Sequence, residues 1–200
     1  MKLFSCLCFG VVGFSAANAQ TLHLVLHSPP GEWIGGGVDN DVTYSLSTAA
    51  IFDVELATWN GAPGPNYLIF NMMELPVSTH YMLGQFGTQM LGTPLAPGTY
   101  LNAERAAFAS AGHGGLDISF EHRGSNTLTG SFTIHDITYH QQASTWVLDS
   151  FDASFSQNSE GRPLALTGRI TYSTVPEPGS LLAIGAGLTL LSIRRRRNTA

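Results

Sequence analysis

Apolar and polar side chains alternate with a period of two along most of the chain. In each run an apolar residue recurs at nearly every second position, and most of the residues between are polar. The runs are Leu22 to Leu26, Val42 to Leu46, Phe52 to Leu56, Leu116 to Phe120 and Leu164 to Tyr172. This is the period of a strand with one face in the core and the other in solvent. The pattern therefore predicts half-buried antiparallel strands.

A change of phase interrupts one long run near its middle. Leu128 and Ile134 share one phase, whereas Ile137 and Tyr139 share the other. One extra residue in a strand produces such a shift, so we predict a β-bulge near His135-Asp136.

Two segments depart from simple alternation. Tyr67 to Met73 is apolar on both faces, as expected of a strand near the middle of a sandwich. Asn102 to Ser110 contains good helix formers but lacks an apolar stripe, so we expect a single helical turn at most. Short strands separated by turn signals, such as Asn60-Gly61, indicate an all-β fold. The predicted architecture is an antiparallel β-sandwich.

The first nineteen residues have the pattern of a secretory signal peptide. Lys2 supplies a positive charge, Leu3 to Phe14 is apolar, and Ala17 and Ala19 are small residues at the two positions that signal peptidase reads. We therefore expect residues 1–19 to be removed by cleavage after Ala19. The expected body is residues 20–174.

The last part of the chain, residues 175–200, has three sections in a fixed order. Val175-Pro176-Glu177-Pro178 is held extended by its two prolines, which suits it to a protease cleft. The apolar stretch Leu181 to Ile193 follows, and it is shorter than the roughly 20 residues that span a bilayer comfortably. A cluster of four arginines then favours the cytoplasmic side. The cluster is Arg194, Arg195, Arg196 and Arg197.

These three sections together resemble the PEP-CTERM sorting signal, also labelled "ice-binding protein C-terminal domain". The resemblance implies that the Pro-Glu-Pro motif lies just outside the inner membrane of a Gram-negative bacterium. It also implies a short transmembrane helix as a transient anchor and cleavage by an exosortase, a membrane-embedded cysteine protease. The body would then pass to the cell surface or extracellular matrix. The ice-binding label describes proteins that carry the tag and implies no ice binding here.

Composition narrows the partners of the body. Both cysteines, Cys6 and Cys8, lie in the signal peptide, so the body has no disulfide and no thiolate metal site. Residues 20–174 hold four arginines and thirteen acids, which gives a formal charge of −9. A surface of this charge repels nucleic acid and anionic membranes but tolerates divalent cations and neutral sugars.

The last third of the body resembles a β module found in secreted bacterial proteins of unassigned function. The resemblance rests on five stretches: Pro97-Gly98-Thr99-Tyr100, Gly115-Leu116-Asp117-Ile118, Asn126 to Phe132, Phe151 to Phe155 and Leu166 to Tyr172. The family often has cysteines where this chain has Ser125 and Ser159. If these serines occupy former disulfide positions, their Cα atoms should lie within roughly 7 Å. Strands 127–139 and 146–157 should then be neighbours.

The body offers few candidates for catalytic or metal chemistry. Its seven histidines lack the spacing of a zinc site, and no cofactor is expected. They are His23, His27, His80, His113, His122, His135 and His140. His113-Gly114-Gly115 is interpreted as a glycine-rich turn. Asp39 and Asp41, after a glycine triplet, could supply oxygens to Ca²⁺, although a plain turn is favoured.

Two further sets of residues suggest carbohydrate chemistry. The carboxylate pairs Asp53/Glu55 and Asp149/Asp152 could serve a hydrolase, but alternation with core residues favours a solvated sheet face. The aromatics could stack on sugar rings or fill the core. They are Trp33, Trp59, Trp146, Tyr67, Tyr81 and Tyr100.

The sequence therefore favours an exported, non-enzymatic surface or exopolysaccharide-matrix protein, with signal peptidase and exosortase as processing partners. The alternatives are a carbohydrate-binding module, with matrix polysaccharide as its partner, and a carboxylate-dependent hydrolase. The first requires at least two coplanar exposed aromatics on one sheet face. The second requires two acids converging in a cleft.

Overall fold

The structure is a computed structural model that describes residues 18–75 and 80–176. Within these residues, ten strands and one 3₁₀ turn follow one another. The strands are β1 (Asn18–His27), β2 (Asn40–Ser45), β3 (Ile51–Ala57), β4 (Tyr67–Met73), β5 (Met82–Gly87), β6 (Gly98–Arg105), β7 (Gly115–Phe120), β8 (Leu128–Gln142), β9 (Thr145–Ser159) and β10 (Ala165–Pro176). The 3₁₀ turn η1 (Ala106–Phe108) lies between β6 and β7. The all-β prediction is confirmed, and Ala19–Thr174 form one compact unit.

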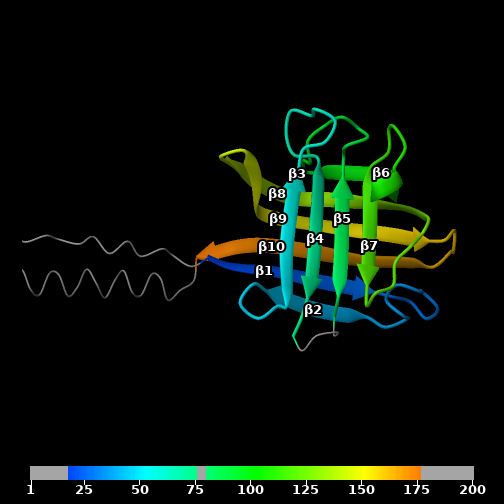
Figure 1. Ribbon diagram of the computed structural model, residues 1–200. Coiled ribbons are helices and arrows are strands. Elements are labelled where there is room, and N and C mark those ends of the chain that lie inside the picture. Colours follow the sequence, from blue (N-terminus) through cyan, green and yellow to red (C-terminus); the bar gives the residue numbers. More distant parts are fainter. Residues whose placement is uncertain (1–17, 76–79, 177–200) are drawn as a thin grey trace, which may run out of the picture. The chain divides into compact units, whose positions relative to one another are not determined.

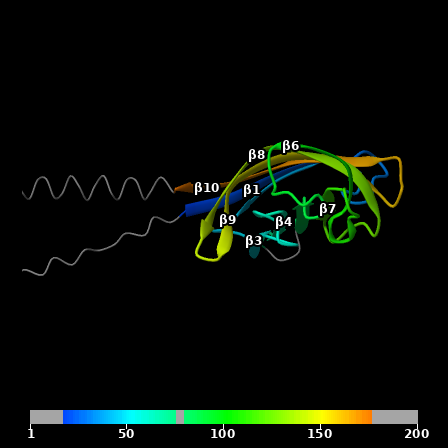
Figure 2. The same ribbon diagram turned by 90° about the horizontal axis from the view of Figure 1, so that it is seen from above.

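The strands form one continuous sheet that folds over into two layers. Its order in the described chain is β2-β1-β10-β9-β8-β6-β7-β5-β4-β3. β3, β4, β5 and β7 make one layer and cross the strands of the other at a steep angle (Figure 1). Seen from above, β8, β9, β10 and β1 arch over β3, β4 and β7 (Figure 2). The predicted sandwich is present, with a hydrogen-bonded corner joining its layers.

Strand β6 makes that corner. It pairs with β8 through Glu104↔Thr129 on one side, and with β7 through Glu104↔Gly115 and Arg105↔Leu116 on the other. The β6–β7 pairing is parallel, unlike the antiparallel pairs that the sequence predicted. A register shift between Tyr100 and Ala103 bends β6, and Asn102 there adopts a positive φ of 53°. The bend lets one strand serve both layers.

Aromatic side chains from both layers meet in the core. Phe86 of β5 packs edge-on against Phe132 of β8, with ring centroids 5.4 Å apart. It also contacts Phe151 of β9 at 5.1 Å, and Phe151 contacts Phe70 of β4 at 5.5 Å. All four are fully or almost fully buried. These contacts explain why the period-two residues of facing strands point inward.

The expected local irregularities are confirmed. The β8–β9 register shifts between Ile134 and Asp136, where the bulge was predicted. Asn102 to Ser110 contains only the single turn η1. Tyr67–Met73 forms β4, which lies between β3 and β5. These features were encoded locally, in phase and helix propensity.

Four apolar residues depart from the burial that simple alternation predicted, and one of them, Leu164, lies just before β10 and is exposed. Leu46 lies just beyond the end of β2 and is exposed. Phe52 and Val54 are only half-buried, because β3 is the last strand of the sheet and has a neighbour on one side only. An edge strand has fewer packing partners than a central one, so its apolar face stays partly open.

Candidate functional site

The two ends of the described chain lie side by side. β1 and β10 are neighbours in the sheet, and Thr21 Oγ1 and Ser173 Oγ are 3.4 Å apart. β10 lies between β1 and β9, and its register with β9 continues to Ser173↔Ser150. The start of β1 and the end of β10 emerge at the same edge (Figure 1). Both predicted processing sites therefore adjoin one end of the body.

Most of the predicted processing residues lie outside the described residues. These are Ala17 of the signal peptidase site, Glu177, Pro178 and the arginines Arg194, Arg195, Arg196 and Arg197. Ala19 lies in β1, and the backbone of β10 ends with Val175 and Pro176. The division into residues 1–19, 20–174 and 175–200 thus stays a prediction.

Each of five histidines is paired with a carboxylate. The pairs are His23–Asp41 (2.6 Å), His27–Asp39 (2.8 Å), His80–Glu121 (3.3 Å), His113–Glu104 (3.7 Å) and His140–Asp149 (2.9 Å). His135 contacts Ser154 Oγ at 3.0 Å, and His122 stacks on Tyr81 with ring centroids 4.7 Å apart. In residues 18–75 and 80–176, no three His, Cys, Asp or Glu side chains gather in a way that could hold a metal ion.

The candidate calcium residues Asp39 and Asp41 are each paired with a histidine of β1, His27 and His23 respectively. Asp39 accepts hydrogen bonds from His27 and from the Ser28 backbone, which lower the pKa of its carboxyl. The loop between β1 and β2, which contains Gly35-Gly36-Gly37, is organised by the buried Glu32. The sequence pattern did not single out this residue. Its carboxylate accepts from Ser28 Oγ and from backbone N–H groups of the loop at 2.7–2.8 Å. The segment before Asp39 is therefore a turn, as the sequence favoured, and the buried carboxylate of Glu32 holds it together.

The two candidate carboxylate pairs have different surroundings. Asp152 receives two hydrogen bonds from the Arg169 guanidinium, at 2.8 and 2.6 Å, and they hold its pKa below the ordinary value. Asp149 is paired with His140. Asp53 and Glu55 are both exposed and line an open groove of about 610 Å³ beside Trp146. A general acid needs a desolvated carboxyl, whereas Asp53 and Glu55 are both exposed to solvent.

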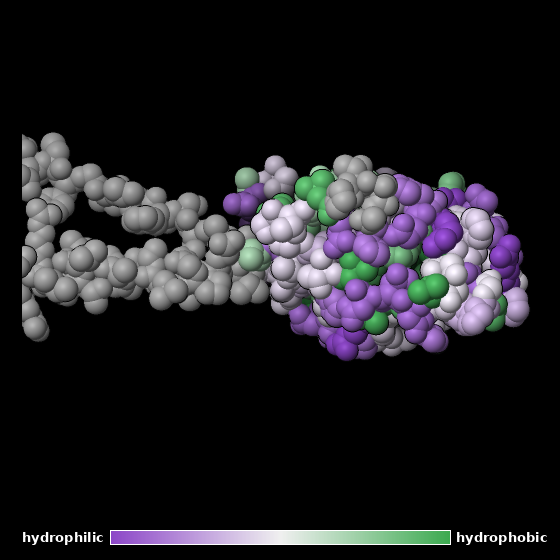
Figure 3. All heavy atoms as spheres, turned by 90° about the horizontal axis from the view of Figure 1, so that it is seen from below, coloured by the Kyte–Doolittle hydropathy of each residue, from purple (hydrophilic) through white to green (hydrophobic). Residues whose placement is uncertain are grey.

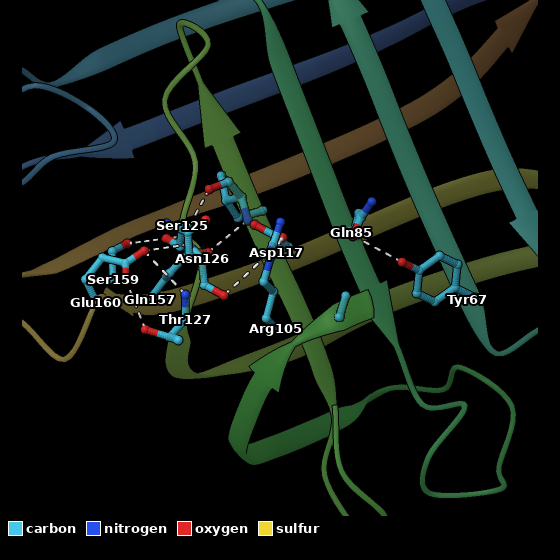
Figure 4. Close-up of polar contacts among 12 residues, drawn as sticks. Tyr67, Gln85, Arg105, Asp117, Ser125, Asn126, Thr127, Gln157, Ser159 and Glu160 are labelled. Carbon is cyan, nitrogen blue, oxygen red and sulfur yellow. Dashed lines mark hydrogen bonds and ion pairs between the residues drawn. The ribbon is translucent and has the colours of Figure 1, made fainter. Parts of the chain in front are cut away.

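Ser125 and Ser159 are in side-chain contact, whereas the resemblance of the body to the secreted β module stays a prediction. Both are buried, and Ser125 Oγ donates to Ser159 Oγ at 2.6 Å. β8 and β9 pair along their length, from Leu128↔Ser159 to Gln142↔Thr145. Glu160 accepts hydrogen bonds from the backbone N–H groups of Asn126 and Thr127. Ser125, Asn126 and Thr127 belong to the β7–β8 loop. Their hydrogen bonds to the Ser159 and Glu160 side chains therefore hold this loop against the end of β9 (Figure 4).

A glutamine side chain completes the free edge of β7. β6 pairs with β7 only as far as Leu116 in the described chain. At Ile118, two residues beyond Leu116, the side-chain amide of Gln157 makes the hydrogen bonds that a neighbouring strand would make. Its Oε1 accepts from Ile118 N at 2.8 Å, and its Nε2 donates to Ile118 O at 2.9 Å. Phe120 then exchanges two backbone hydrogen bonds with Arg123. Gln157 is fully buried, so it links β9 of one layer to β7 of the other (Figure 4).

Asp117, predicted on a solvated face, is instead 5% exposed. Arg105, from the parallel strand β6, covers it and donates Nε to Oδ2 at 2.9 Å. Burial raises the pKa of Asp117, and the hydrogen bond and charge of Arg105 oppose that rise. Arg105 also lies over the exposed Phe108 ring, 5.0 Å from its centroid. Asp117 is buried because β6 pairs with β7, which the sequence did not predict, and places Arg105 over it.

The tryptophans do not form the flat platform that the glycan-binding alternative requires. Trp33 and Trp59 are each about half exposed, whereas Trp146 packs against the core. In the described chain the close aromatic pairs that include a tryptophan are tilted or edge-on, at 57° for Trp59–Tyr67 and 86° for Tyr139–Trp146. Trp59 instead lines a pocket of about 340 Å³. The other lining residues are Asn60, Tyr67, Gln89, Met90, Ala106, Ala107 and Ala109.

Surface hydropathy and helix length in the described residues bear on contact with a membrane. One face of the body is mostly hydrophilic, with apolar side chains scattered among polar ones (Figure 3). Over the same residues no helix has the length and apolar character needed to cross a bilayer. The predicted transmembrane stretch, Leu181 to Ile193, lies outside them.

Comparison with known proteins identifies the C-terminal signal. Residues 174–197 match the family model of the PEP-CTERM protein-sorting motif. No curated protein and no solved structure matches the chain. The resemblance of the C-terminal segment is thus confirmed, and the motif supports exosortase-dependent sorting of an exported protein. The match does not extend to the β body.

Proposed function

We propose that the chain is a non-enzymatic protein of the cell surface or exopolysaccharide matrix, delivered there through its C-terminal signal. Signal peptidase removes residues 1–19, the stretch Leu181 to Ile193 holds the precursor in the inner membrane, and an exosortase cuts near Pro176-Glu177-Pro178. The observation that carries this proposal is the sorting-motif match over residues 174–197.

The arrangement of β1 and β10 supports this processing route. Because Thr21 and Ser173 are in contact, both membrane-directed segments connect to one end of the body. The pairing of β10 with β9 continues to Ser173, so this pairing lies on the body side of a cut after Pro176. The body can therefore keep its fold when both ends are removed.

A non-catalytic role is supported by how the acids of the body are used. Asp152 and Asp149 are held by Arg169 and His140, and the buried Glu32 accepts hydrogen bonds within its own loop. These acids act as structural acceptors. The hydrolase alternative would have to use the exposed Asp53 and Glu55, and it remains the weaker candidate.

Replacing Pro176-Glu177-Pro178 with three alanines tests the sorting proposal. In a host with an exosortase, the variant should accumulate as uncleaved precursor in the inner membrane, because the extended recognition segment is lost. Immunoblots of membrane, surface and medium fractions measure this. Pro163→Ala, at an exposed turn of the body, is the matched control and should be processed normally. Normal processing of the triple variant would refute the proposal.

The second candidate is a carbohydrate-binding module for matrix polysaccharide that uses a pocket, because the coplanar aromatic platform expected from the sequence is not formed by the tryptophans of the described chain. One observation favours it, namely the pocket in which Trp59 and Tyr67 meet at an angle. It is compatible with sorting, because binding to the matrix would retain the processed body outside the cell.

A further inference from the structure

We propose that the pocket at Trp59 binds one pyranose residue of an uncharged glycan. This inference rests on the second candidate function and names its site and ligand class. The pocket lies where the β3–β4 loop, the β5–β6 loop and η1 meet, at one end of the β3-β4-β5-β7 layer.

Two aromatic rings form a corner with one ring presented to solvent. Trp59 is 53% exposed and Tyr67 is 7% exposed, and their ring centroids are 5.7 Å apart with planes inclined at 57°. The Tyr67 ring packs against the indole at this angle, and its hydroxyl donates to Gln85 at 3.1 Å (Figure 4). The free part of the indole is a flat apolar surface with a polar N–H, which suits the C–H face and hydroxyl rim of a sugar ring.

The corner is held in place by a fully buried side chain. Asn66 Oδ1 accepts from the Trp59 backbone N–H at 2.8 Å, and Asn66 Nδ2 donates to Trp59 O at 3.1 Å. The Thr88 N–H donates to Asn66 O at 2.8 Å and joins the second loop to the first. An exposed tryptophan on a pinned loop loses little conformational freedom when a ligand stacks on it.

The lining is uncharged and carries amides. Gln89 Nε2 donates to Ala106 O at 2.9 Å and its Oε1 is buried, so this amide braces the pocket wall and offers no free acceptor to a ligand. The Gln89 side chain lies against Gly87, where a Cβ would overlap its amide. Asn60, in left-handed backbone with φ 56°, places a second amide at the exposed rim. Amides both donate to and accept from hydroxyls, so they match a sugar better than a hydrocarbon.

The negative charge of the body favours neutral sugars over anionic ones. The pocket's lining has no charged side chain among the described residues, and residues 20–174 carry a formal charge of −9. A uronate or sulfated sugar would enter against this field with no cation in the pocket to pair with. A neutral hexose or an N-acetylated hexosamine meets no such barrier. A volume of about 340 Å³ is near the lower end of typical ligand pockets, which suits one ring and not a long chain.

Ligand-observed NMR can test this with the full chain, purified in a detergent that has no sugar headgroup. The probes are methyl glycosides of glucose, galactose, mannose and N-acetylglucosamine, with methyl glucuronide as the charged comparison. We expect saturation transfer to at least one neutral glycoside and at least tenfold weaker transfer to the glucuronide. Trp59→Ala should weaken the binding of the neutral probe at least tenfold, and Ala107→Glu should do the same by adding charge to the wall.

The matched control is Trp33→Ala, because Trp33 is 51% exposed and lies on the β1–β2 loop outside the pocket. It should leave binding unchanged. Three results would overturn the proposal: no neutral probe binds, Trp59→Ala binds as well as the parent chain, or the glucuronide binds best. None of these bears on cleavage at Pro176-Glu177-Pro178, so sorting and glycan binding can fail separately.

Discussion

Replacing Gln157 with leucine is expected to lower the free energy of unfolding by about 2–5 kcal/mol, because two buried polar groups lose their partners. Gln157 is 0% exposed, and its amide satisfies both the N–H and the C=O of Ile118. Leucine has a similar size but can do neither. A loss of this size is a large share of the roughly 5–15 kcal/mol that stabilises a typical domain. Urea unfolding followed by tryptophan fluorescence measures it.

Gln141→Leu provides the matched control for this substitution. Gln141 is exposed near the end of β8, so the same exchange should change the free energy of unfolding by no more than about 0.5 kcal/mol. If the two variants unfold at the same urea concentration, the Gln157 amide does not complete the edge of β7.

Replacing Ser125 and Ser159 together with cysteines is expected to form a disulfide and stabilise the body. Their hydroxyl oxygens are 2.6 Å apart, and both side chains are buried. The two positions are separated by 34 residues. Closing a loop of that length should add about 3–4 kcal/mol to the free energy of unfolding, through a less disordered unfolded chain. Unfolding curves with and without reductant measure the gain.

The single variant Ser159→Cys separates the disulfide from other effects. Once residues 1–19, which contain Cys6 and Cys8, are removed, it has no partner within the chain, so reductant should leave its stability unchanged. Two free thiols in the air-oxidised double variant would show that the positions do not have disulfide geometry. In the natural chain the hydrogen bond between Ser125 and Ser159 keeps the β7–β8 loop against the end of β9 without a covalent bond.

Local strand structure was readable from the sequence because burial and period are local properties. Leu22, Leu24 and Leu26 are buried as the alternation predicted, and the phase change at His135-Asp136 is a bulge. The order of the strands was not readable, because it depends on pairings between distant segments. The parallel β6–β7 contact is the clearest example, and it buries Asp117 beneath Arg105.

The sequence did contain an unused signal for one buried polar group. Phe151, Ala153 and Phe155 point into the core, and the same period continues through Gln157 to Ser159. Polar residues at the core positions of a strand need buried partners, and Ile118 and Ser125 supply them. The sequence marked Trp59 and Tyr67 as aromatics that could stack on sugars, but it did not show that they share a pocket, because the β3–β4 loop, the β5–β6 loop and η1 build that pocket together. The sorting motif was fully readable, since its chemistry lies in consecutive residues.

Mass spectrometry of the protein from cytosolic, membrane, surface and medium fractions tests the export account most directly. The account predicts a surface or medium form that begins at Gln20 and ends close to Pro178, without Arg194, Arg195, Arg196 and Arg197. Full-length chain, from Met1 to Ala200 and dissolved in the cytosol as the main form, would contradict it.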